Sequence, residues 1–111
     1  MQLPLQITYR GMQSSPAIDA AVHEKAAKLE QFHPRIMSCR VAIEQPGRHQ
    51  RQGKQFVVHI DLKLPGGEIA VNRDHHEDVY VALRDAFDAA RRKLEDFARE
   101  QRGDVKRHDA P

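Results

Sequence analysis

The 111-residue chain has few side chains of several kinds, and each shortage argues against a class of protein. Its single cysteine, Cys39, can form no internal disulfide, which favours a reducing compartment. Tryptophan is absent and aromatic residues make up 5%, so an extended platform for stacking bases is poorly supplied. The chain has no long apolar run, and its first residues lack a charged signal-peptide region. We therefore expect a cytoplasmic protein without a membrane segment.

The composition that remains fits one small domain with a mild basic bias. With 40% hydrophobic residues, the chain can bury a modest core without a metal or a disulfide. The net charge is +2, and the 12 arginines outnumber the 6 lysines. Arginine is the better bidentate partner for phosphate. We predict a single domain over residues 1–102 and a short disordered tail over residues 103–111.

The first third of the sequence predicts a strand followed by a helix. The strand alternates apolar and polar residues and is expected to end at Gly11; its apolar residues are Leu3, Leu5, Ile7 and Tyr9. Ser14-Ser15-Pro16 is a helix start, with a serine cap before proline at the first helical position. The helix is expected to reach about Phe32, and one face carries Ile18, Val22, Ala26, Leu29 and Phe32.

The rest of the sequence predicts three strands and a second helix. The first two strands carry Met37, Cys39, Val41 and Ile43, and then Phe56, Val58, Ile60, Leu62 and Leu64. Pro65-Gly66-Gly67 forms a tight turn into a short strand that contains Ile69 and Val71. The final helix is expected from about Glu77 to Arg102, with Glu77 and Asp78 in its first turn and Gly103 at its end. Its apolar face contains Tyr80, Leu83, Phe87, Ala90, Leu94 and Phe97.

This order, β-α-β-β-β-α, predicts an α+β fold with a four-stranded mixed sheet. A helix between the first two strands suits a crossover that joins parallel neighbours, and the later strands form hairpins. Because each helix has one apolar stripe, we expect both helices on the same face of the sheet. The other face meets solvent and carries Arg40, His59, Asp61 and Lys63.

No arrangement in the sequence predicts catalysis. It contains no G-x-S-x-G, P-loop or H-E-x-x-H motif. Cys39 lies in the apolar row of a strand, where an inert core thiol is expected. The run His75-His76-Glu77-Asp78 does not match a known metal-ligand spacing. We therefore expect no enzyme, cofactor, metal site or small-molecule substrate.

Basic side chains on the two helices predict a cationic channel. Lys25 falls inside the apolar arc of the first helix, with Lys28 beside it, and Arg84 and Arg91 follow the edge of the second. If the helices pack side by side, these cations share a groove suited to a phosphate backbone. The alternative is that they are solvated. A lysine can extend past apolar surface without a partner. On the second helix, Asp88 is spaced to pair with Arg84 or Arg92, and Glu95 is spaced to pair with Arg91 or Arg99.

Four segments, in this order, resemble the ribosome hibernation-promoting factor family of ribosome-associated translation inhibitors. They are Ile7-Thr8-Tyr9-Arg10, the helix from Ala17 through Lys25-Ala26-Ala27-Lys28-Leu29-Glu30 to Phe32, Leu64-Pro65-Gly66-Gly67, and His76-Glu77-Asp78-Val79-Tyr80. The resemblance covers residues 3 to 102. The chain is similar to the short form of the family, which has no dimerisation domain of its own.

The resemblance implies a non-enzymatic protein that binds the small ribosomal subunit and its ribosomal RNA near the decoding site. Binding there blocks messenger and transfer RNA and inhibits translation. The family's RNA contacts fall here on Lys25, Lys28, Arg92 and Arg10, and helix geometry adds Arg84 and Arg91. One departure is Ala89, where relatives often carry a lysine, and Arg91 and Lys93 are candidates to replace it.

Two other functions agree with the residues taken alone. One is a general module for structured RNA without preference for ribosomes. The other is a protein-interaction domain in which the helix charges only pair with one another. Binding to unrelated RNA distinguishes the first from a ribosome factor, and indifference to RNA at low salt identifies the second.

Overall fold

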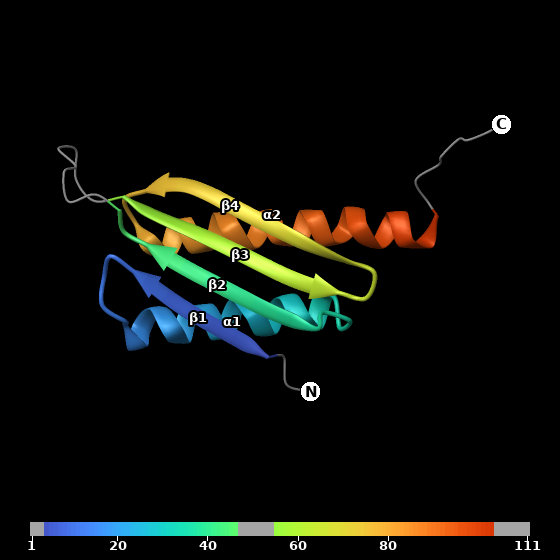
Figure 1. Cartoon of the computed structure of the whole chain (residues 1–111), viewed down its shortest axis with the longest axis horizontal. Helices are drawn as coiled ribbons and strands as arrows, with labels where there is room; N and C mark the ends of the chain where they lie inside the picture. The colour runs from blue at the N-terminus through green and yellow to red at the C-terminus, as the bar shows by residue number, and fades with distance from the viewer. Residues whose placement is uncertain (1–3, 47–54, 104–111) are drawn as a thin grey trace.

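A computed structural model describes residues 4–46 and 55–103, with the backbone alone for residues 73–75. Its elements in chain order are β1 (Leu5–Arg10), α1 (Pro16–Phe32), β2 (Ser38–Glu44), β3 (Phe56–Leu64), β4 (Gly67–His76) and α2 (Val79–Arg102) (Figure 1). The predictions for Leu3 and for the tail after Gly103 lie outside the described residues.

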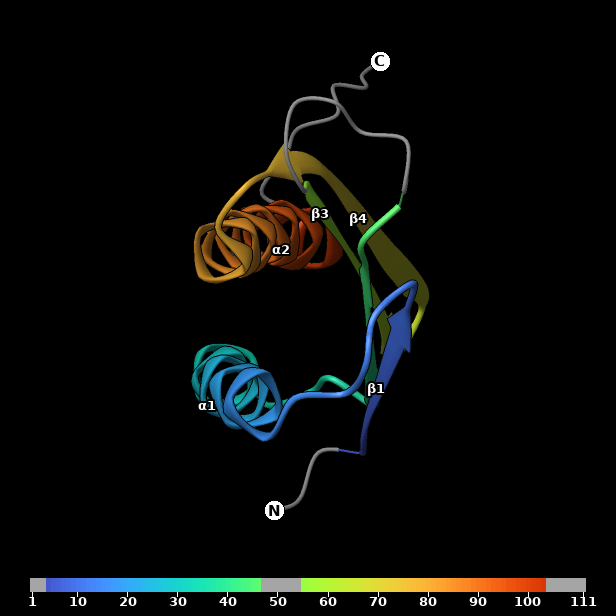
Figure 2. The same ribbon diagram turned by 90° about the vertical axis from the view of Figure 1, so that its left-hand side faces the viewer.

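The strands form one sheet in the order β1-β2-β3-β4. β1 runs parallel to β2, with Leu5 opposite Cys39 and Tyr9 opposite Ile43, and the other two pairings are antiparallel. Both helices cover the same face of this sheet (Figure 2). The predicted α+β fold, with its mixed sheet and one helical layer, is therefore confirmed.

The start of α1 is fixed by local hydrogen bonds. The Ser15 hydroxyl accepts from the Ile18 amide at 3.2 Å, and Pro16 takes the first helical position, as predicted. The Tyr9 hydroxyl on β1 lies 2.6 Å from Asp19 Oδ1 and 3.1 Å from the Ser15 carbonyl oxygen. Burial and the hydrogen bond to Asp19 raise the pKa of Tyr9 to about 12. This hydroxyl therefore ties the helix to the first strand.

Glycine is required where β1 ends. Gly11 has φ of 71°, and a Cβ there would lie 2.5 Å from the Gln45 carbonyl oxygen. The prediction that Gly11 ends the strand is confirmed.

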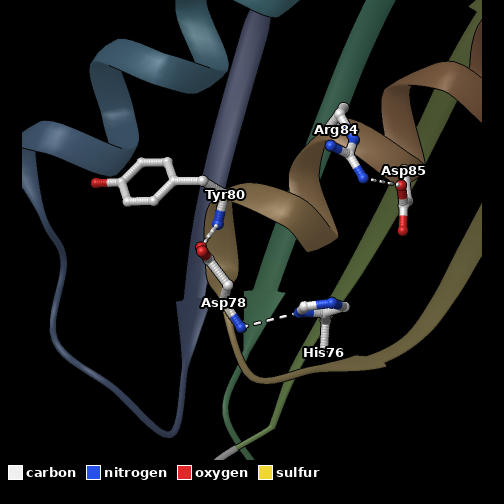
Figure 3. A network of polar contacts seen from close by, with 5 residues as sticks. All are labelled: His76, Asp78, Tyr80, Arg84 and Asp85. Atoms are coloured by element: carbon white, nitrogen blue, oxygen red, sulfur yellow. Dashed lines mark hydrogen bonds and ion pairs between the residues drawn. The ribbon is translucent and has the colours of Figure 1, made fainter.

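The start of α2 differs from the prediction by two residues. Asp78 precedes the helix as its N-cap, and its Oδ1 accepts from the Tyr80 amide at 2.9 Å (Figure 3). The Asp78 amide donates to His76 Nδ1 at 3.0 Å. The placement of Glu77 and Asp78 in the first turn was therefore wrong, because the aspartate acts as a cap. Gly103 ends the helix in the left-handed region, as predicted.

The core lies between the helices and the inner face of the sheet, and β4 is longer than the short strand expected. The fully buried side chains include Val22, Cys39, Val41, Ile43, Val58, Ile60, Leu62, Leu83 and Leu94. Cys39 is fully buried and is therefore a core residue, as predicted, and this burial raises the pKa of its thiol to about 12.

Three residues predicted on buried faces are exposed. Phe32 is 42% exposed, Tyr80 46% and Met37 53%. Phe32 is the last residue of α1, Tyr80 lies in the first turn of α2, and Met37 precedes β2. Periodicity gives the direction of a side chain, but the side chain is buried only where another element covers that direction. None of the described helices has the length and apolar character needed to cross a bilayer.

Candidate nucleic-acid interface

A groove of about 360 Å³ runs between α1 and α2, which lie side by side on the sheet (Figure 2). We call it the interhelical groove. Its lining comprises Lys25, Lys28, Leu29 and Phe32 from α1 and Arg84, Phe87, Asp88 and Arg91 from α2. The lining therefore contains four basic side chains, two from each helix, one acidic side chain from α2, and the apolar side chains Leu29, Phe32 and Phe87.

The two lysines of the groove are free of ion pairs among the described residues. Lys25 is half-buried, so its methylene stem lies along apolar surface beside Leu29, while Lys28 is exposed. An ammonium without a partner at the end of a fixed stem is available to an anion. The sequence placed both lysines at this groove, and the structure does bring them together.

The two arginines of the groove each have a weak partner. Arg84 Nη2 lies 3.3 Å from Asp85 Oδ1, and Figure 3 shows its side chain turned toward that carboxylate. Arg91 Nη2 lies 3.8 Å from Glu95 Oε2. Ion pairs this exposed contribute little to stability, so a phosphate can replace either carboxylate at small cost.

The predicted helix pairs are only partly correct. The Arg91–Glu95 pair forms, whereas Arg84 pairs with Asp85 instead of Asp88. Arg99 likewise pairs with Asp96, at 2.5 Å, instead of Glu95. Asp88 is left lining the groove as its single acid.

The structure separates the remaining predicted residues from the groove. Arg92 is exposed on α2 and Arg10 is exposed at the end of β1, and neither is part of the groove lining. The predicted set therefore divides into four grouped side chains and two, Arg92 and Arg10, that lie apart from them.

Ala89 does not face the groove. It is buried, and Lys93, four residues further along α2, donates from Nζ to the Ala70 carbonyl oxygen on β4 at 2.8 Å. Lys93 therefore contacts the sheet, while Arg91 lines the groove. Of the two candidates to replace a lysine at position 89, only Arg91 is placed to contact a ligand in the groove.

Sequence reasoning missed the aromatic part of the groove. The Arg91 guanidinium lies over the Phe32 ring, 5.0 Å from its centroid, and both side chains line the groove. The available signal was the spacing of Phe32 four residues after Lys28 and seven after Lys25, which puts all three on one side of α1. Among the described residues, no group of three or more His, Cys, Asp or Glu side chains is arranged to hold a metal ion.

Comparison with known proteins gives a family match and similarity to curated relatives. Residues 5–102 match the family described as Sigma 54 modulation protein / S30EA ribosomal protein. A ribosome hibernation promotion factor from Deinococcus radiodurans is 28% identical over 94 residues, which cover 83% of this chain and 47% of the relative. The chain thus spans about half the length of that relative.

Two solved structures have the same fold. A ribosomal subunit interface protein from Coxiella burnetii superposes with a TM-score of 0.74 at 18% identity, covering 86% of this chain and 98% of that one. The N-terminal domain of Protein Y from Thermus thermophilus gives a TM-score of 0.70 at 23% identity, covering 87% and 99%. At these identities the likeness concerns the fold alone.

Proposed function

The chain belongs to the Sigma 54 modulation protein / S30EA ribosomal protein family, and we propose on this basis that it is a ribosome-associated hibernation factor. In this proposal it binds the small ribosomal subunit near the decoding site, in the cytoplasm, and blocks messenger and transfer RNA. The names of its relatives, a ribosome hibernation promotion factor and a ribosomal subunit interface protein, support the ribosome as the partner.

The interhelical groove is the observation that carries the proposal. Four basic side chains face one acid there, and the two lysines have no ion pair among the described residues. A phosphate backbone laid along the groove would meet two free ammonium groups and two guanidinium groups whose present partners are weak. We assign RNA binding to Lys25, Lys28, Arg84 and Arg91, with Arg92 and Arg10 as outlying contacts.

Inhibition follows from occupancy and requires no chemical step. A rigid domain seated where messenger and transfer RNA bind excludes both while it remains bound. Its affinity depends on the release of counterions from the RNA, so it should fall steeply as salt is added. A factor of this kind is reversible by competition, which suits a protein that preserves ribosomes while translation stops.

Sedimentation with purified ribosomes tests the proposal. The protein is mixed with small subunits at low and at physiological salt, with and without messenger RNA and initiator transfer RNA. We expect stoichiometric co-sedimentation that these ligands reduce, because they compete for the same site. Binding that the ligands leave unchanged would contradict the decoding-site location.

The same experiment separates the two other functions. Equal affinity for an unrelated structured RNA would identify a general RNA-binding module. Failure to bind ribosomes or RNA at either salt concentration would contradict any role for the groove in RNA binding and favour a protein-interaction domain.

A further inference from the structure

A second cavity, of about 570 Å³, lies beyond the groove, where α2 extends past the turn between β3 and β4 (Figure 1). We call it the terminal cavity. Segments far apart in the sequence form it: the residues just after α1, Pro65 in the turn, and the last three turns of α2. Its volume falls within the range of about 300–1,000 Å³ that is usual for small-ligand sites.

The walls of the terminal cavity combine flat apolar surface with three arginines and one acid, namely Arg35, Arg99, Arg102 and Glu95. Phe97 packs on the β3–β4 turn so closely that a Cβ at Gly67 would lie 2.8 Å from its Cε1. Pro34 and Ala98 add further apolar surface. Arg35, at the rim, is exposed and has no ion pair among the described residues. These features favour a ligand with a flat ring and a negative charge.

His33 supplies a ring nitrogen that makes no hydrogen bond with the part of the chain that the structure describes. Its Nδ1 is buried and has no hydrogen-bond partner among the described residues. Leaving a buried ring nitrogen without a hydrogen bond is energetically unfavourable. Because this atom has no hydrogen bond to break, the imidazole ring can rotate and point Nδ1 into the cavity. Imidazole nitrogens donate or accept according to the tautomer, and the edges of nucleobases offer both kinds of partner.

The terminal cavity adjoins the interhelical groove at one residue. Phe32 belongs to the lining of both, with Arg91 over its ring on the groove side. A strand whose phosphates follow the groove would therefore reach the cavity at the end of α1. Because the groove binds charge and the cavity offers flat surface, the two suit consecutive parts of one polynucleotide.

We infer that the terminal cavity takes one unstacked nucleotide of the RNA strand whose neighbouring phosphates lie in the interhelical groove. This inference rests on the proposed function. The base packs against Phe97, Ala98 and Phe32, His33 binds its edge, and Arg35 contacts the adjoining phosphate. The protein thereby gains a contact that depends on a base, in addition to contacts that depend only on the backbone.

Nuclear magnetic resonance with two matched octanucleotides tests the inference. One is octauridylate, and the other has the same sugar-phosphate backbone without bases. We expect both to shift the signals of Lys25 and Lys28, and only octauridylate to shift the His33 ring and the Ala98 amide. Uridine monophosphate serves as a third probe for free nucleotides.

Filling the cavity gives a second readout. Ala98→Trp should weaken octauridylate binding about tenfold, the usual effect of losing one base contact, and leave the baseless octamer unaffected. Ala27→Trp, on the exposed outer side of α1, is the matched control and should change neither affinity. Since the tryptophan at position 98 risks misfolding, Arg35→Ala at an exposed site should weaken octauridylate binding without altering thermal unfolding.

Each other outcome contradicts a definite part of the inference. If both octamers shift His33 equally, or if only the groove responds, the cavity takes no base and the groove assignment stands. If uridine monophosphate matches octauridylate at His33, the occupant is a free nucleotide and not part of an RNA strand. If neither region responds to any probe, and ribosomes also fail to bind, the proposed function and this inference both fail.

Discussion

The interhelical groove and the outer face of the sheet both carry basic side chains, but only the groove has them in excess. On the outer face, Arg40 lies opposite Asp61 in the register of β2 and β3, and Lys63 Nζ lies 3.5 Å from Glu68. His59 Nε2 lies 3.8 Å from Glu44. In the groove, Arg84 and Arg91 pair with Asp85 and Glu95, but Lys25 and Lys28 have no ion pair among the described residues.

The difference lies in arrangement and not in composition. The clearest difference lies in the two lysines, because an ammonium without an acidic neighbour keeps its full attraction for a polyanion, whereas a paired charge has a field that falls off quickly. Charges grouped along a groove add their fields over a low-dielectric floor. A net charge of +2 for the whole chain therefore hides one surface with two lysines that are unpaired among the described residues and another on which Lys63 and His59 have acidic partners and Arg40 lies opposite Asp61.

The largest expected difference between the two surfaces comes from reversing two charges on each of them in separate variants. We expect Lys25→Glu with Lys28→Glu to lower ribosome affinity by at least about a hundredfold, because contacts between charged groups contribute about 1.5–3 kcal/mol each. The matched control, Arg40→Glu with Lys63→Glu, should bind like the parent. Sedimentation measures both, and circular dichroism checks that both fold. Equal losses from the two pairs would mean that the groove has no special role.

The next largest difference should be in how strongly RNA affinity depends on salt when a cation of either surface is removed. Four phosphate contacts, at the slope usual for single strands, predict that affinity falls about fiftyfold between about 50 and about 200 mM salt. Arg84→Ala should reduce the slope of log affinity against log salt by about one, and Lys63→Ala should leave it unchanged. Fluorescence anisotropy with labelled RNA gives both slopes. A slope unaffected by Arg84→Ala would remove that residue from the interface.

Removing the acid of the groove should have a smaller effect of opposite sign. Asp88→Asn relieves repulsion of a phosphate and should strengthen binding about two- to fivefold, the scale of an exposed charge interaction. Asp61→Asn on the outer face is the matched control, with no change expected. Weaker binding by the Asp88 variant would indicate that this carboxylate positions a cation and does not repel the RNA.

Alkaline pH should lower the stability of the whole domain without changing the difference between the two surfaces, because the groups that titrate lie in the core that both surfaces share. The pKa of Cys39 rises from 9.0 to about 12 on folding, so the stability linked to its neutral form is complete below pH 9 and is lost as pH rises toward 12. Tyr9 adds a loss of the same sign from about pH 10. Urea unfolding measures the free energy of unfolding at each pH. The alkaline loss of stability should be smaller in Cys39→Val, and it should be equal in the two charge-reversed double variants.

Local rules predicted most of the fold. Ser15 and Pro16 determine where α1 starts, and alternation along β3 predicts which of its residues are buried. The error at Asp78 arose because an acid in the first turn and an acid at the cap give the same sequence pattern. Which one forms depends on where β4 ends, and that strand runs on to His76.

The groove was partly predictable and the terminal cavity was not. Lys25 and Lys28 follow from helical geometry once the two helices are assumed to share a face. Phe32 is exposed because α1 stops there while α2 continues past the sheet, which periodicity does not record. The orphaned nitrogen of His33 depends on contacts between segments some 60 residues apart, so no local pattern reveals it.

The hydrogen bond from Lys93 to Ala70 has a consequence for how the molecule behaves at high concentration. β4 is an edge strand, and an exposed edge is a template on which strands of other molecules can assemble into aggregates. The Lys93 ammonium occupies a carbonyl oxygen of that edge and puts a positive charge beside it. A second copy approaching along β4 would have to displace that charge, so the helix that helps form the groove also hinders strand pairing at this point of the β4 edge.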